Sequence, residues 1–197
     1  MKPTHTMTTG LLILCLSLVV SFVVPATAAD TYQLDPEHTS VVFRVKHLGV
    51  AYVYGRFNGP GGSFVFDEKS PGNSSIEIQV NAQNVDTAVK KRDNHLKSPD
   101  FFNAEENPVI TFKSTSVKKA GKDDYEVAGN LTLLGKTRPI TVIARQTGGG
   151  KDPWGNYRRG FETSFAIKRS DFGMNFMMGG VSDDVQLTVS VEGIRQK

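Results

Sequence analysis

Cysteine is almost absent from this chain, with one residue in 197. That residue, Cys15, lies within an apolar stretch near the N-terminus, so the sequence beyond it has no thiol. Disulfide bonds, thiol catalysis and cysteine–zinc sites are therefore excluded for residues 29–197. A domain of roughly 168 residues buries enough surface to be stable without such cross-links.

Long apolar runs are also scarce. The one that occurs, residues 11–24, follows Lys2. It is shorter than the roughly 18 residues that a membrane-spanning helix needs. Small residues at 26–28 come next. A basic start, a short apolar stretch and a small-residue site are together typical of a secretory signal peptide.

We therefore predict that residues 1–28 are a signal peptide, cleaved after Ala28, and that residues 29–197 form one exported domain in the periplasm. An uncleaved anchor fits the short apolar run less well. A lipid-anchored cysteine is also disfavoured, because Leu14 is too bulky for the residue before such a cysteine.

Blocks of like charge are missing as well. The chain has 23 basic and 20 acidic residues, for a net charge of +3 at pH 7, and they are spread along the sequence. This balance predicts neither a nucleic-acid-binding surface nor attraction to an anionic membrane. We expect no nucleic-acid partner and no stable membrane insertion of residues 29–197, and the oligomeric state stays open.

Motifs for nucleophilic catalysis are absent, since no G-x-S-x-G element occurs. Asp35, Glu37 and His38 are close enough in sequence to form a corner for a hard metal ion. A turn that begins at Asp35 is the simpler explanation of this stretch. We therefore expect no catalytic residue, no metal and no cofactor.

Alternation of apolar and polar residues is what the sequence has in abundance. Val41, Phe43 and Val45, for example, share one face of an extended chain, and the residues between them share the other. Gly55 predicts a bulge or a sharp coil. Similar patterns predict strands in the segments 39–49, 52–59, 63–73, 75–85, 108–117, 124–135, 138–150, 160–170 and 185–193.

One segment lacks this alternation. Its composition predicts a short helix over residues 87–96, with Asp86 or Thr87 as the N-cap and Pro99 ending it. The basic residues of this helix predict a solvated face. The alternative is a cap whose cations meet an anionic headgroup at the mouth of a barrel.

Eight or so short strands separated by turns are typical of a β-sandwich or a closed barrel. We favour the barrel, because a sheet without disulfides gains from having no exposed edges. The predicted fold is all-β: an extended, eight-stranded, antiparallel, lipocalin-like barrel with one short capping helix. Such a barrel is either solid or holds a small ligand.

Phenylalanine is enriched, with 12 residues. A solid core would also use them, but residues 169–180, RSDFGMNFMMGG, favour a ligand cavity, because flexible methionine suits an irregular apolar partner. Met177 and Met178 are expected in its wall or lid. His47 is either a polar contact in this cavity or a hydrogen-bonded residue at the rim. The residues predicted to bind the ligand are Phe43, Val45, His47, Phe57, Phe64, Phe66, Leu96, Phe101, Phe102, Phe112, Phe165, Ile167, Phe172, Met174 and Phe176.

Several stretches from about Tyr32 onwards form a recognisable set: YQLDPEHTSVVFRVKHLG, GRFNGPGGSFVFDE, VDTAVKKRDNHLKSPDFFNAEENPVITFKSTSV, GNLTLLGKTRPI, DPWG, RSDFG and VQLTVSVEG. In these stretches the chain resembles the YceI-like, lipocalin-related family. The resemblance implies an extended antiparallel barrel of eight strands that binds a polyisoprenoid lipid, such as a prenyl quinone or a prenyl phosphate, without enzymatic activity. It implies no catalytic motif to transfer.

Three interpretations of function follow. The first is a periplasmic protein that binds, transports or stores a polyisoprenoid lipid in an apolar interior. The second is a solid barrel that acts as a stress-protective or protein-binding module. The third is an enzyme that acts on a small lipophile with His47 or His38 as acid–base, although no motif supports it.

Overall fold

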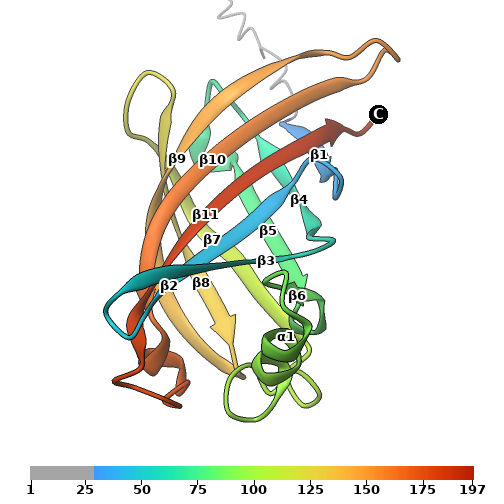
Figure 1. Ribbon diagram of the computed structural model, residues 1–197. Helices are drawn as coiled ribbons and strands as arrows, with labels where there is room; N and C mark the ends of the chain where they lie inside the picture. The colour runs from blue at the N-terminus through green and yellow to red at the C-terminus, as the bar shows by residue number, and fades with distance from the viewer. Residues whose placement is uncertain (1–28) are drawn as a thin grey trace, which may run out of the picture.

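The computed structural model describes residues 29–197, which form one barrel with a short helix near one end (Figure 1). The predicted signal peptide and its cleavage site lie outside the described residues. The strands are β1 (Asp30–Leu34), β2 (Ser40–His47), β3 (Ala51–Phe57), β4 (Gly61–Phe66), β5 (Ser75–Asn81), β6 (Val85–Asp86), β7 (Val109–Lys119), β8 (Asp124–Leu133), β9 (Lys136–Lys151), β10 (Tyr157–Lys168) and β11 (Val181–Arg195).

Eight of these strands close into a ring in the order β1-β4-β5-β7-β8-β9-β10-β11, and β11 returns to β1. Neighbouring strands in the ring are antiparallel. The predicted eight-stranded antiparallel barrel with one short helix is therefore confirmed. The closing strand β1 was missed by the sequence analysis, because its five residues are too few for a clear alternating pattern.

The β2–β3 hairpin widens one side of the barrel. β1 and β2 both pair with β11, at Leu34–Gly193 and Ser40–Ser190, so β2 continues along β11 where β1 ends. β3 pairs with β2 along its length, but its other edge pairs with β6 only at Arg56–Asp86 and Phe57–Val85. Within residues 29–197, no other strand pairs with this edge, which leaves the sheet open there.

Helix α1 (Lys90–Lys97) lies beside this opening (Figure 1). It begins three residues later than predicted, because Ala88 has a left-handed φ of 60° that a helix cannot contain. Neither predicted cap is correct. Val89 is the N-cap residue and makes no side-chain cap, while Asp93 accepts hydrogen bonds from the backbone and hydroxyl of Thr87.

Three short 3₁₀ turns complete the described chain: η1 (Pro71–Asn73), η2 (Ala82–Asn84) and η3 (Arg169–Phe172). The last of these follows β10 and begins the methionine-rich loop, residues 173–180. Gly173 ends η3 with φ of 85°, a left-handed backbone that favours glycine. The strand pattern of β10 therefore stops at Lys168. Residues after it, such as Phe172, do not keep the inward orientation that strand alternation would give them.

Candidate binding cavity

The barrel contains an elongated apolar cavity of about 230 Å³. On β11 its lining runs from Val181 to Val191. These ten residue steps cover roughly 33 Å of strand at about 3.3 Å per residue. A cavity of this length suits a chain-like ligand better than a compact one.

The cavity wall carries few polar groups. Glu162 is exposed and, by the alternation of β10, its side chain faces away from the lumen. Thr163 faces inward, and its buried hydroxyl has no hydrogen-bond partner among the described residues. Of the 38 lining residues, the polar ones are Ser74, Ser75, Thr111, Glu162, Thr163 and Arg169. The wall can therefore hold an apolar chain by burial and dispersion rather than by directed hydrogen bonds.

Most of the residues predicted to bind a ligand line this cavity. They are Phe43, Val45, Phe57, Phe64, Phe66, Leu96, Phe101, Phe102, Phe112, Phe165, Ile167 and Met174. For the residues on strands, parity explains the agreement, since residues two apart on a strand share the inward face. Leu96 lies on α1, and Phe101, Phe102 and Met174 lie on loops, where parity does not apply. Contact with a ligand at each position stays a prediction.

His47, Phe172 and Phe176 do not line the cavity. His47 has inward parity, but it lies at the end of β2 on the hairpin tip and is exposed. Phe172 belongs to η3, where strand parity no longer applies, and it is buried beneath the cavity beside Met174. Phe176 is 37 % exposed in the methionine-rich loop and packs edge-to-face on Phe101.

The sequence analysis also missed lining residues. It concentrated on phenylalanine and left out the aliphatic residues and the tyrosine that share the inward face of their strands. The parity of β5, β7, β8 and β11 was the signal that would have found them. The principal ones are Val80, Ile110, Tyr125, Leu131, Val185 and Leu187.

Three glycines make room for phenylalanine rings inside the barrel. A Cβ on Gly55 would lie 2.2 Å from the Phe43 ring, and one on Gly129 would lie 2.4 Å from the Phe112 ring. Gly193 similarly lies against Phe64 at 2.4 Å. Each ring thus occupies the space that a side chain at the glycine position would need. The predicted bulge at Gly55 is wrong, because the β2–β3 register runs through it without a shift.

Aromatic rings close the cavity at the end where β1 completes the ring. Tyr32 and Phe64 stack with centroids 4.6 Å apart, and Phe66 packs edge-to-face on Phe161 at 5.1 Å. The guanidinium of Arg159 lies 4.6 Å from the Phe66 ring centroid. This closed end is therefore filled by large side chains.

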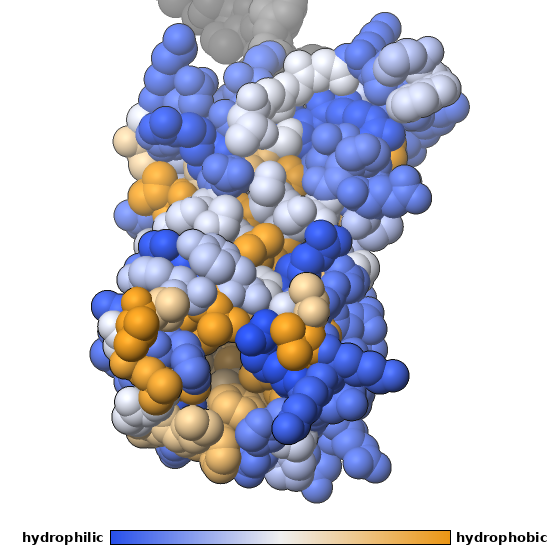
Figure 2. Space-filling view, viewed as in Figure 1, coloured by the Kyte–Doolittle hydropathy of each residue, from blue (hydrophilic) through white to orange (hydrophobic). Residues whose placement is uncertain are grey.

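The other end is open. Figure 2 shows a hollow in the lower half of the molecule, with apolar side chains around it, where Figure 1 places the tip of the β2–β3 hairpin and α1. Leu96, Phe102 and Val181, from elements at this end, line the cavity. We refer to this side as the open end.

Arg169 fixes the methionine-rich loop at the open end. Its side chain is 2 % exposed and donates hydrogen bonds to the backbone carbonyls of Met174, Phe176, Val181 and Ser182 at 2.8–3.0 Å. Burial lowers the pKa of Arg169. Four carbonyl dipoles thus hold one buried cation and set the shape of the loop.

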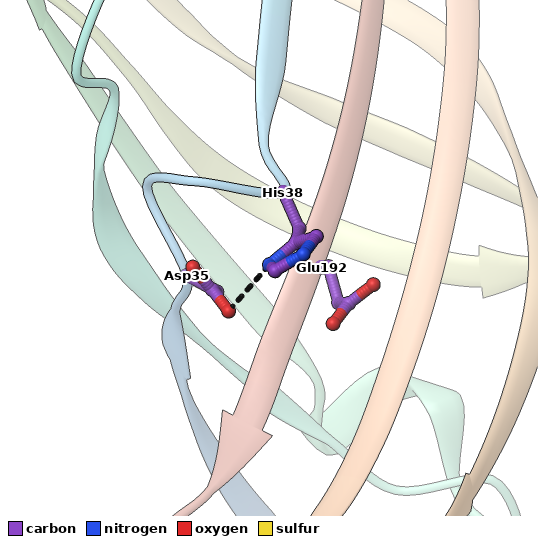
Figure 3. A group of neighbouring side chains, drawn as sticks. All are labelled: Asp35, His38 and Glu192. Carbon is purple, nitrogen blue, oxygen red and sulfur yellow. Dashed lines mark hydrogen bonds and ion pairs between the residues drawn. The ribbon is translucent and has the colours of Figure 1, made fainter. Parts of the chain in front are cut away.

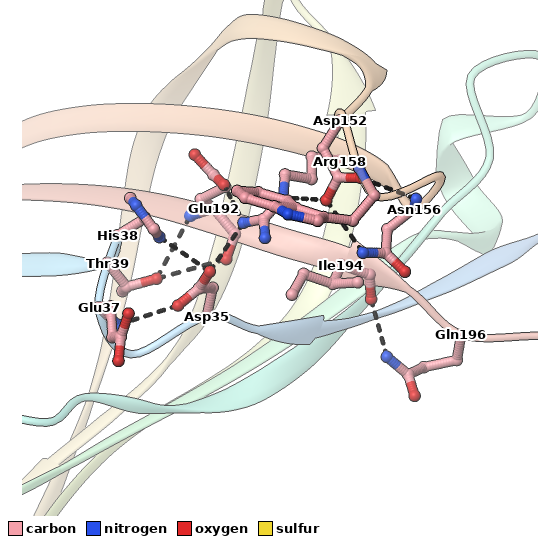
Figure 4. Close-up of polar contacts among 11 residues, drawn as sticks. Asp35, Glu37, His38, Thr39, Asp152, Asn156, Arg158, Glu192, Ile194 and Gln196 are labelled. Carbon is pink, nitrogen blue, oxygen red and sulfur yellow. Dashed lines mark hydrogen bonds and ion pairs between the residues drawn. The ribbon is translucent and has the colours of Figure 1, made fainter.

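The DPEH stretch forms a different cluster from the predicted one. Asp35 and His38 come together with Glu192 of β11, and Glu37 is not part of the group (Figure 3). Arg158 donates from Nη1 to Asp35, at 2.7 Å, and to Glu192 (Figure 4). The positive charge that these carboxylates require is therefore supplied by a side chain.

Arg158 also ties in the β9–β10 turn through Asp152, at 2.8 Å. Burial acts to raise the pKa of Asp35, but hydrogen bonds from Arg158 and His38 outweigh it and hold this pKa at about 2. The same balance holds the pKa of Asp152 at about 2. The hydrogen bond to Asp35 in turn raises the pKa of His38. This network joins β1, β10 and β11 at the closed end.

Comparison with known proteins places the chain in a family. The model of the YceI-like domain matches residues 32–193. The chain belongs to the YceI-like family. A UPF0312 protein of Pseudomonas aeruginosa (strain LESB58) is 50 % identical over 173 residues, which are 87 % of this chain and 90 % of that protein.

Solved structures of YceI-like proteins share the fold. The Campylobacter jejuni YCEI protein superposes with a TM-score of 0.70 at 30 % identity, covering 77 % of this chain and 90 % of that one. A polyisoprenoid binding domain from Saccharophagus degradans superposes with a TM-score of 0.64 at 14 % identity, covering 86 % and 100 %. The second likeness shows the fold alone. Among the described residues, no helix combines the length and apolar character needed to cross a membrane.

Proposed function

We propose that this YceI-like protein binds a polyisoprenoid lipid, a prenyl quinone or a prenyl phosphate, along its barrel interior, and carries or stores it without chemical change. The observation that carries the proposal is the long apolar cavity, whose wall offers almost no directed polar contact. The Saccharophagus degradans domain, described as a polyisoprenoid binding domain and sharing the fold, supports it.

The energetics favour a branched hydrocarbon chain. Each buried methylene contributes about 0.8 kcal/mol before the costs of association are subtracted. A prenyl chain repeats such groups along its length, so a cavity lined by Phe and aliphatic residues would gain affinity with each unit. A headgroup left at the open end would contribute less, and the proposal therefore includes weak headgroup specificity.

A non-enzymatic role is part of the proposal. Among the lining residues, Glu162 faces outward and Arg169 is engaged by backbone carbonyls. The two histidines of the enzyme interpretation, His38 and His47, are exposed outside the cavity. A general acid or base must reach the reacting atom, and the cavity wall supplies no such pair.

The predicted signal peptide supports action in the periplasm, since residues 1–28 have the pattern of an export signal. Residues 29–197 would then meet lipids between two membranes. A solid barrel without a ligand is the remaining alternative, and the cavity does not favour it.

Native mass spectrometry of the protein purified from the periplasm tests the proposal. We expect an added mass that organic solvent releases and that fragments as repeating isoprene units. Phe165→Asp, which places a charge in the cavity wall, should abolish the added mass. Ser164→Asp is the matched control, because Ser164 is the exposed neighbour on the same strand.

A protein without added mass that also takes up no ubiquinone from ethanol solution would disprove the proposal. A folded Phe165→Asp variant that carries as much lipid as the wild type would disprove the assignment of the interior. Circular dichroism of both variants establishes whether they are folded.

A further inference from the structure

Five exposed apolar side chains surround part of the open end. Val50 is 83 % and Leu48 60 % exposed on the turn between β2 and β3, and Phe176, Met177 and Met178 are 37–46 % exposed on the methionine-rich loop. We call these five residues the apolar rim. Single exposed apolar residues are common, but a group of them beside a cavity mouth marks an interaction surface.

The two turns that carry the apolar rim are joined to each other. The backbone NH of Leu48 donates to the carbonyl of Gly180 at 2.7 Å, and His47 pairs with Val181. Phe176 contacts the loop after α1 through Phe101 and the helix itself through His95, with ring centroids 5.4 Å apart in both pairs. The rim is thus a formed surface, held from beneath by Arg169.

Two rim residues occupy backbone positions that favour glycine or asparagine. Leu48 has φ of 49° and Met177 has φ of 50°. A left-handed backbone is costly for residues other than glycine, asparagine and aspartate. Leucine and methionine at such positions therefore lower stability through backbone strain, and their exposed side chains gain little from burial in return. Both side chains lie close to Gly180, yet they are 60 % and 46 % exposed, which points to a role outside the fold.

Charged residues are absent from both turns. No Asp, Glu, Lys or Arg lies between Lys46 and Arg56, or between Asp171 and Asp183. Helix α1, which contacts Phe176 through His95, carries exposed Lys90 and Lys91, and His95 is paired with the exposed Asp100 at 2.8 Å. The uncharged apolar tip itself matches the chemistry of a bilayer surface, where apolar groups enter the acyl boundary.

We propose that the apolar rim docks on the surface of a lipid bilayer and brings the cavity mouth to it, so that a polyisoprenoid passes between membrane and barrel without crossing water. The inference rests on the proposed function, and it names the partner of the same site. A bilayer is favoured over a protein because the rim lacks polar groups for a specific interface, and because the cavity behind it opens at the rim.

A vesicle experiment tests the docking. The purified protein is sedimented with vesicles of phosphatidylethanolamine and phosphatidylglycerol, and compared with the double variant Leu48→Asn/Met177→Asn. Asparagine accepts the left-handed backbone, so this variant removes the apolar groups without straining the fold. We expect its vesicle affinity to fall at least about tenfold, while its melting temperature stays the same or rises.

Trp154→Asn is the matched control. Trp154 is 78 % exposed on the β9–β10 turn near the closed end, and it is as apolar as the rim residues. Its replacement should leave vesicle binding unchanged. Equal binding by the wild type and the double variant, or an equal loss in Trp154→Asn, would overturn the docking. So would light scattering that shows the wild type as a dimer and the double variant as a monomer, because the rim would then cover a second copy.

Uptake of ubiquinone separates this inference from the proposed function. Both proteins should bind ubiquinone equally when it is added from ethanol, whereas the double variant should take it up more slowly from vesicles. Equal uptake rates from vesicles would overturn the docking and leave the proposed function intact. If neither protein binds ubiquinone by either route, the proposed function fails, and sedimentation with lipid alone decides the docking.

Discussion

Two arginines on one stretch of chain hold opposite ends of the barrel in different ways. Arg158, at the start of β10, is paired with the carboxylates of Asp35, Asp152 and Glu192. Arg169, just beyond the end of β10, is bonded to four backbone carbonyls instead. Carboxylates fasten the closed end with charge. Neutral carbonyls fasten the methionine-rich loop, and the nearby carboxylate of Asp183 accepts hydrogen bonds from Ser170 instead.

The difference shows how a stable barrel can keep one apolar end. The exposed methionine side chains at the end of the loop pack against few other groups, so they contribute little to fixing the loop's conformation. A buried guanidinium with planar, fixed donors can order several carbonyls at once. The two turns that carry the exposed apolar side chains at the open end contain no Asp, Glu, Lys or Arg, whereas Lys151 and Asp152 lie at the β9–β10 turn of the closed end.

The largest effect is expected from Arg169→Met. Removing the guanidinium leaves four carbonyls without their donor, so we expect a loss of about 3 kcal/mol in the free energy of unfolding. Urea denaturation measures this loss. Amide hydrogen exchange should rise in residues 173–181, where the loop is released. Lys168→Met is the control, because Lys168 is the exposed neighbour. Unchanged exchange in the loop would contradict the assigned role of Arg169.

A smaller effect is expected from Arg158→Met, about 2 kcal/mol at neutral pH, because three carboxylates lose a shared partner that is partly exposed. Arg145→Met, which breaks a surface pair with Asp124, should change stability little.

The pH dependence of stability provides a second measurement on the closed end. The folded-state pKa of Asp35 is about 2, below its ordinary value of 3.8. A lowered pKa stabilises the fold above pH 3.8, and this contribution is lost as the pH falls toward 2. Melting temperatures of the wild type should therefore fall across this range, and Arg158→Met should flatten the decline. An equal decline in both proteins would show that Arg158 does not set this pKa.

The smallest effect on stability is expected from Gly129→Ala, about 1–2 kcal/mol, because its Cβ would meet both the Phe112 ring and the carbonyl of Lys113. The Phe112 ring would be pushed into the lumen. The free energy of ubiquinone binding should therefore decrease in magnitude by more than the free energy of unfolding does. Gly148→Ala is the control, since nothing lies within 4 Å of its Cβ. If Gly129→Ala binds ubiquinone as well as the wild type, the glycines do not set the bore of the cavity.

The interior could be predicted from the sequence where strands are regular. Phe43, Val45 and Phe165 follow the period-two rule, and each lines the cavity. The rule failed at strand ends. His47 is carried beyond the wall on a hairpin tip, and Phe172 has entered a 3₁₀ turn, so neither position keeps the orientation that counting in twos assigns.

Local signals failed where a distant contact decided the structure. Gly55 is a strand residue beneath the Phe43 ring rather than a bulge. The helix begins at Lys90 because Ala88 is left-handed, although Thr87 is a good cap in isolation. The balance of charges predicts no attraction to an anionic membrane, and that stays a prediction. The exposed apolar rim depends on which turns meet at one end, and composition does not report this.

The sequence by itself determined the all-β class, the short helix and the inward face of the regular strands. The face of a strand residue is predictable because alternation follows directly from the geometry of an extended chain. Only the tertiary structure decided that the phenylalanines surround a space instead of filling it. Ring packing depends on what stands opposite. The glycines that receive Phe43 and Phe112 lie on neighbouring strands, and Gly193, which receives Phe64, lies two strands away in the ring. The two ends of the barrel also differ through tertiary contacts. Arg158 and Arg169 have the same side chain, but the fold surrounds the first with carboxylates and the second with backbone carbonyls.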